Sequence, residues 1–112
     1  MKHGERMKKL ELLRAVRAKI EQGWTQRAAA RNADGGPVSG NSQDAVCWCM
    51  IGAAQAIAPN SDLQRGAIYT AIYDANKENR PLQLGISDFN DARGRTKEQV
   101  LAVIDRAIEA CQ

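Results

Sequence analysis

Apolar residues recur every three or four positions along three stretches of the chain, which is the spacing of amphipathic helices. We expect the first helix at residues 5–22, followed by Gly23 as a C-terminal cap. The second should begin after Ser61, whose hydroxyl can cap a helix start. The third should begin after Thr96, because Thr96 and Gln99 have the spacing of a capping box. The apolar positions of the three helices are Met7, Leu10, Leu13, Val16 and Ile20, then Leu63, Ile68, Ala71, Ile72 and Ala75, then Val100, Ile104, Ala107, Ile108 and Cys111.

A fourth stretch is apolar on all sides. Between residues 45 and 58 only Gln55 is polar. A helix without a polar face belongs in the interior of a protein. Ser42 or Asp44 could cap its start, and Pro59 would end it. The pattern therefore predicts a buried central helix around which the other three pack.

Two connections are less regular. Residues 24–40 end in a run rich in glycine and polar residues, so we expect an extended, irregular excursion rather than a helix. The Asp34-Gly35 dipeptide also permits a short hairpin between Thr25 and Val38. Residues 81–95 form a long connection, in which residues 87–91 could make one helical turn. Its apolar residues Leu82, Leu84, Ile86 and Phe89 should hold it against the core.

Composition supports a helical fold. Aromatic residues make up 4% of the 112 residues and hydrophobic residues 44%. A core that is rich in alanine and poor in aromatic residues favours closely packed helices over sheets. We therefore expect one domain over residues 1–112, of the all-α class, with about four helices in a compact bundle.

The distribution of charge and the number of cysteines indicate which partners and which cellular compartment suit the protein. Residues 1–31 contain nine Lys/Arg and three Glu, a balance of +6, whereas residues 32–112 contain seven Lys/Arg and ten Asp/Glu, a balance of −3. This asymmetry permits an anionic partner at the N-terminal face. The longest apolar run is too short to span a membrane, and the N-terminus begins directly with a charged amphipathic pattern. An odd number of cysteines, two of them in an apolar run, indicates reduced thiols and a cytoplasmic protein.

No group of residues has the pattern of a catalytic or metal site. Cys47 and Cys49 would point to opposite sides of a helix, so they are poorly placed to share a metal ion. His3 is the only histidine, which leaves a cysteine nucleophile without a convincing base. Asp88 and Asp91 lie beside arginines, which favour carboxylates that cannot donate a proton. We expect no enzymatic activity, no metal and no cofactor.

Polar residues before the last helix are the first candidates for binding. Asn90, Asp91, Arg93 and Arg95 could hold an anion beside the helix start, with the arginines supplying charge-assisted bonds. The alternative is structural, because Asn and Asp commonly bond to the backbone in tight turns. Trp24 and Arg27 form a second candidate surface, since Trp and Arg are frequent anchors of interfaces.

Three blocks of sequence resemble a known family. They are Gly23-Trp24-Thr25-Gln26, then Trp48-Cys49-Met50-Ile51-Gly52-Ala53, then Ile86-Ser87-Asp88-Phe89-Asn90-Asp91 continuing through Gly94-Arg95-Thr96 to Asp105-Arg106-Ala107. Their order resembles a family of small bacterial and phage proteins of unknown function, in which a Trp is associated with the place of Phe89. The resemblance implies a single compact domain and no activity.

The sequence therefore predicts a small non-enzymatic binding module that acts through surface contacts. Its partner would be a protein, and a phage-encoded inhibitor or accessory protein is one form this could take. The alternative is a binder of an anionic ligand, such as a nucleotide, a signalling molecule or a nucleic-acid backbone, through basic residues. Binding to phosphates weakens steeply with salt, which distinguishes the two.

Overall fold

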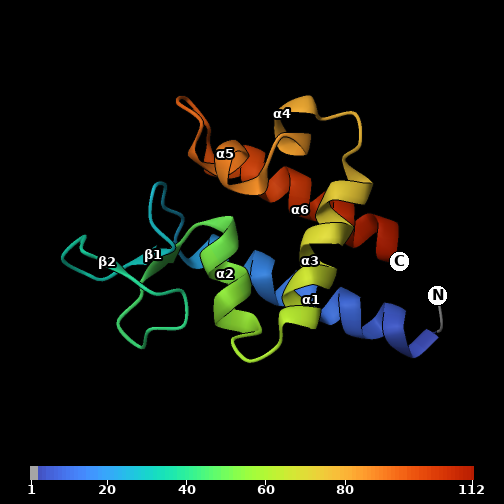
Figure 1. The fold of residues 1–112 in the computed structure, drawn as a ribbon, viewed down its shortest axis with the longest axis horizontal. Coiled ribbons are helices and arrows are strands. Elements are labelled where there is room, and N and C mark those ends of the chain that lie inside the picture. Colours follow the sequence, from blue (N-terminus) through green and yellow to red (C-terminus); the bar gives the residue numbers. More distant parts are fainter. Residues whose placement is uncertain (1–2) are drawn as a thin grey trace.

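The computed structural model describes residues 3–112, with the side chains of His3, Glu5, Arg6 and Met7 outside the described part. Within this range the chain forms six helices and three short strands, and 59% of it is helical (Figure 1). In chain order these elements are α1 (His3–Gln22), β1 (Ala30–Arg31), β2 (Pro37–Val38), β3 (Cys47–Trp48), α2 (Met50–Ile57), α3 (Asp62–Ala75), α4 (Arg80–Gln83), α5 (Ile86–Asp91) and α6 (Lys97–Cys111).

The N-terminal helix α1 packs against three other helices and one strand. It contacts α6, α2, α3 and β3. The face of α1 that packs on the core is a stripe of aliphatic residues at helical spacing, as predicted. The helix ends before Gly23, also as predicted. The stripe consists of Leu10, Leu12, Leu13, Val16 and Ile20, all buried. The apolar helix at residues 50–57 is buried as predicted, since none of its residues is exposed, but the last helix packs on α1 and α3.

The prediction for residues 45–58 was wrong at its start. The helix α2 begins only at Met50, and its N-cap is Cys49, whose thiol accepts a hydrogen bond from the Gly52 N–H at 3.3 Å. Ser42 and Asp44 do not cap it. Residues 47–48 are instead β3, because their backbone pairs with β1 in the register Ala30↔Trp48. An apolar run alone does not distinguish a buried strand from a buried helix.

The three strands form a small antiparallel sheet in the order β2-β1-β3, so the fold is mostly helical rather than all-α. The sheet lies at the opposite end of the molecule from the start of α1 and the end of α6 (Figure 1). The hairpin alternative for residues 24–40 is confirmed, with Ala30 opposite Val38. Its turn is held by the Asn32 side chain, which accepts hydrogen bonds from the N–H groups of Asp34 and Gly36.

Small residues let α2 touch neighbouring backbone. A Cβ atom added to Gly52 would lie 1.8 Å from the carbonyl oxygen of Ala29. One added to Gly40 would lie 2.3 Å from the carbonyl oxygen of Gly52. Both distances are shorter than real contacts allow, so these two glycines are required for the close approach of α2 to the segments on either side of the hairpin.

The connection at residues 81–95 contains two short helices, α4 and α5. Leu82, Ile86 and Phe89 are buried, as predicted. Leu84 is 73% exposed, which corrects its assignment as an anchor. The residue follows α4 as its C-cap, where the chain turns, so its side chain faces away from the core. The capping box of α6 is confirmed, with Thr96 and Gln99 bonding to each other's backbone N–H groups.

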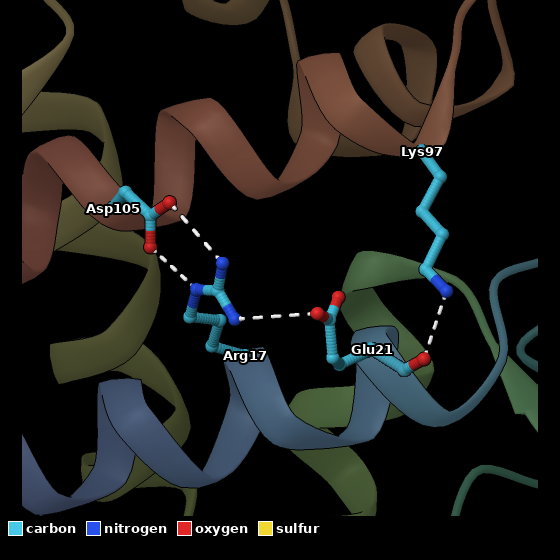
Figure 2. A network of polar contacts seen from close by, with 4 residues as sticks. All are labelled: Arg17, Glu21, Lys97 and Asp105. Atoms are coloured by element: carbon cyan, nitrogen blue, oxygen red, sulfur yellow. Dashed lines mark hydrogen bonds and ion pairs between the residues drawn. The ribbon is translucent and has the colours of Figure 1, made fainter.

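Polar contacts join α1 to α6 along their exposed edges (Figure 2). The Arg17 guanidinium donates to the Asp105 carboxylate at 2.6 Å and lies 3.9 Å from Glu21. The bond to Asp105 raises the pKa of Arg17, which keeps the guanidinium charged. Lys97 donates to the Glu21 carbonyl at 2.8 Å, near the C-terminal end of α1. No helix in the described residues combines the length and apolar character needed to cross a membrane.

Candidate functional site

Asn90 lies at a junction between three segments that are far apart in sequence. Its Oδ1 accepts hydrogen bonds from the Trp24 indole N–H at 2.9 Å and from the Met50 backbone N–H at 3.1 Å. Its Nδ2 donates to the Thr25 carbonyl at 3.1 Å and to the Asp91 carboxylate at 3.0 Å. The side chain is 0% exposed. Asn90 therefore holds residues 24–25, the first turn of α2 and the end of α5 together.

Asp91 extends this junction to Arg27. The Asp91 carboxylate accepts from the Arg27 backbone N–H at 2.9 Å, and the Arg27 backbone has a φ of 65°. A non-glycine residue rarely adopts this left-handed conformation, which costs roughly 1 kcal/mol. The Gln26 amide adds two bonds, to the carbonyls of Asn90 and Ala92, each at 3.0 Å.

Four of the six predicted binding residues thus belong to one cluster, which we call the Asn90 junction: Trp24, Arg27, Asn90 and Asp91. The sequence suggested two separate surfaces. Nothing in the spacing of residues 24 and 90 indicates that they meet, because the contact depends on how α5 packs against α2. In the junction only Arg27 is exposed, and the polar atoms of Asn90 are occupied by protein partners.

Arg95 is held in a fixed position elsewhere. Its guanidinium carbon lies 3.8 Å from the centroid of the Phe89 ring. Nε donates to the Phe89 carbonyl at 2.8 Å, and Nη1 donates to the Gln99 side chain at 3.3 Å. A guanidinium that stacks on a ring and bonds in its own plane has little freedom to rotate. Arg93, the remaining predicted residue, is exposed and lies outside the cleft described next.

Arg95 and Phe89 line a cleft of about 460 Å³ between the end of α3 and one face of α6. This size is in the range of small-molecule sites, about 300–1,000 Å³. The wall from α6 includes Gln99 and Arg106, which are seven residues apart and so share one helix face. The opposite wall comes from the last turn of α3 and the residues after it.

The two walls differ in charge. Asp74 and Glu78 lie on the α3 side, at the end of a helix whose dipole is negative there, together with Lys77. Arg95 and Arg106 lie on the α6 side. Among the ion pairs of the described residues, none involves any of these five side chains. The cleft can therefore offer charge to a ligand without first breaking an internal salt bridge.

Sequence reasoning found Arg95 but missed the rest of the cleft. Asp74, Lys77, Glu78 and Arg106 look like ordinary charges on the solvent face of a helix. The one available signal was the seven-residue spacing of Gln99 and Arg106, which places them on the same side of α6. Which part of the chain faces that side depends on tertiary packing.

The cysteines show no sign of metal or nucleophilic chemistry. Cys49 is buried, and desolvation raises the pKa of its thiol, which disfavours the reactive thiolate. Cys47 is half-buried in β3, and Cys111 is buried at the end of α6. In the part of the chain that the structure describes, no three His, Cys, Asp or Glu side chains gather as metal ligands would.

Comparison with known proteins gives one match. The model of a family of unknown function (DUF6197) matches residues 5–110. No curated protein and no solved structure matches the chain.

Proposed function

We propose that this chain, which belongs to the family of unknown function DUF6197, is a small binding protein whose cleft between α3 and α6 takes an anionic ligand. One observation carries the proposal. Arg95 is immobilised in the cleft by Phe89 and Gln99, while Arg106 and Lys77 line the same cleft without an ion-pair partner among the described residues.

Immobilising Arg95 makes it a better ligand contact. An arginine at a surface normally loses rotamer freedom when it binds, which costs about 0.5–1.5 kcal/mol. Here the Phe89 ring and two hydrogen bonds already restrict the side chain. A guanidinium can also make two parallel bonds to a phosphate or carboxylate. These features favour Arg95 over Arg93, which has no such support.

The exposed apolar side chains support a large protein interface less well than the cleft supports a small anionic ligand. The exposed large hydrophobic residues among those described are Val46, Leu63 and Leu84. They lie in three separate places, since Val46 precedes β3, Leu63 is in the first turn of α3 and Leu84 follows α4. The 85% exposure of Leu63 corrects its predicted place on the apolar face of this helix. Figure 1 shows the start of α3 and α4 at opposite ends of α3. Interfaces with proteins usually have a buried apolar centre, which these residues do not form together.

A protein partner at Arg27 is the second candidate. Arg27 is exposed and keeps a left-handed backbone that glycine or asparagine would adopt more easily. Its side chain makes one long bond, from Nη2 to the Asp91 carbonyl at 3.5 Å, and arginine is frequent at the centre of interfaces.

The cleft is tested by titration with ribose 5-phosphate and the four nucleoside 5′-monophosphates, measured by calorimetry at low salt. We expect at least one of these probes to bind, and Arg95→Gln and Arg106→Gln each to lower its affinity about tenfold or more, as for loss of a charge-assisted hydrogen bond. Arg93→Gln is the matched control, because it removes a neighbouring exposed arginine outside the cleft. If no probe binds, or if Arg93→Gln reduces binding as much as Arg95→Gln, the proposal is wrong.

A further inference from the structure

We infer, as a deepening that rests on the proposed function, that the cleft ligand is a nucleotide. Its base would stack on the guanidinium of Arg95, and its phosphate would bind Arg106. The inference uses three features of the cleft, which are the orientation of Arg95, the spacing of the two arginines and the acidic wall opposite them.

Arg95 forms a flat platform in the cleft. Its guanidinium carbon lies over the Phe89 ring, 3.8 Å from the ring centroid, and its N–H groups are bonded to the Phe89 carbonyl and to Gln99. Because Arg95 also lines the cleft, the contact it can offer a ligand is through its remaining face and remaining edge. Nucleobases stack on arginine planes as they do on aromatic rings. A phosphate alone would use only the edge and would leave the face uncovered.

The spacing of the contact residues along α6 suits a ligand with a base at one end and a phosphate at the other. Gln99, which contacts Arg95, is seven residues before Arg106. At 1.5 Å of rise per residue, the two positions are roughly 10 Å apart along the helix. A nucleoside monophosphate extends over a comparable length from base to phosphate. Arg106 is exposed and contacts no described acidic partner, so it is available for the phosphate.

Two carboxylates beside Lys77 on the α3 wall disfavour a ligand that is anionic throughout. Asp74 and Glu78 can only accept hydrogen bonds when ionised, and they repel a second negative charge. A nucleotide presents donors there, from its ribose hydroxyls or the amino groups of its base, while its phosphate stays on the α6 side. Inorganic phosphate and other compact anions have no such division, so they should bind more weakly.

The experiment compares the four nucleoside 5′-monophosphates with ribose 5-phosphate, using calorimetry on the full chain and on Arg95→Lys. Lysine keeps the positive charge but has no plane on which a base can stack. We expect the best nucleotide to bind at least about tenfold more tightly than ribose 5-phosphate, in line with the stacking contribution of one base. Arg95→Lys should abolish most of this difference, so that the best nucleotide and ribose 5-phosphate bind this variant about equally.

Four results are informative. Loss of the nucleotide preference in Arg95→Lys, with its melting temperature unchanged, supports the inference. Equal binding of ribose 5-phosphate and every nucleotide overturns the inference but leaves the anion site intact. Absence of binding by all five probes overturns both. Phe89→Tyr, which keeps a ring beneath Arg95, should retain the preference if the variant melts like the natural chain, and loss of preference there would count against stacking on Arg95.

Discussion

The Asn90 junction and the α3–α6 cleft both bring together polar side chains from distant parts of the chain. They differ in whether those side chains have partners within the protein. In the junction, Asn90 is 0% exposed and makes four side-chain hydrogen bonds to the protein. In the cleft, Arg106 and Lys77 have no ion-pair partner among the described residues. The first arrangement stabilises the fold, whereas the second leaves charge available to a ligand. A residue's distance from a sequence motif does not tell which of these roles it has. The hydrogen-bond and ion-pair partners of its polar atoms do.

Asn90→Ala should have the largest effect on stability. It removes four hydrogen bonds and leaves the Trp24 indole N–H and the Met50 N–H without their buried acceptor. We expect a loss of about 3 kcal/mol in the free energy of unfolding, measured with urea. Asn60→Ala is the control, because Asn60 is exposed and should change stability by less than about 0.5 kcal/mol. If the two variants unfold alike, the junction does not hold the fold together.

Trp24→Phe should have an intermediate effect. It keeps an aromatic ring but loses the indole donor to Asn90, whose Oδ1 still accepts from the Met50 N–H. We expect a loss of about 1 kcal/mol, the typical contribution of one hydrogen bond. A double-mutant cycle with Asn90→Ala should show coupling between the two positions, since they share that bond. Additive effects would mean that the bond contributes nothing.

Arg27→Gly should be neutral or stabilising. Glycine adopts the φ of 65° without the steric cost that arginine has, and the backbone N–H that donates to Asp91 is kept. Glycine also makes the unfolded chain more flexible, which lowers the free energy of unfolding and offsets part of this gain. The net change should lie between zero and about 1 kcal/mol of added stability by thermal melting. A clear destabilisation would show that the Arg27 side chain contributes to folding, which would remove the reason to assign it to a partner.

Arg106→Gln should have the smallest effect on stability, within about 0.5 kcal/mol, because the side chain is exposed and forms no described ion pair. Its effect should appear only in binding. The two variants should therefore have opposite effects. The junction variant Asn90→Ala should lose stability, and the cleft variant Arg106→Gln should lose affinity for the ligand. An Arg106→Gln protein that unfolds much more easily would contradict the separation of the two regions.

Local signals predicted much of the fold. The end of α1 at Gly23 and the start of α6 at Thr96 depend on residues within one helical turn, and both predictions were correct. The strand at Trp48 was missed, because its conformation is set by pairing with Ala30, eighteen positions earlier. A pair of two-residue strands carries no periodicity that a sequence pattern could reveal.

The candidate site was only partly predictable for the same reason. Arg95 was found because it adjoins the start of α6, where an anion is favoured. Arg106 was missed because the wall that faces it comes from residues 74–79, which are distant in sequence. Asn90 was found as a polar residue of interest, but its burial could not be known until Trp24 and Met50 were placed beside it.

The most direct test of the division between junction and cleft is a titration of ¹⁵N-labelled protein with the best-binding nucleoside monophosphate, followed by NMR. The account predicts shifts for residues 74–79, for the Arg95 side-chain Nε–H and for the α6 residues from Gln99 to Arg106. It predicts no comparable shift for the Trp24 indole N–H or the Asn90 amide. Shifts centred on Trp24, Arg27 and Asn90, with residues 74–79 unchanged, would contradict it.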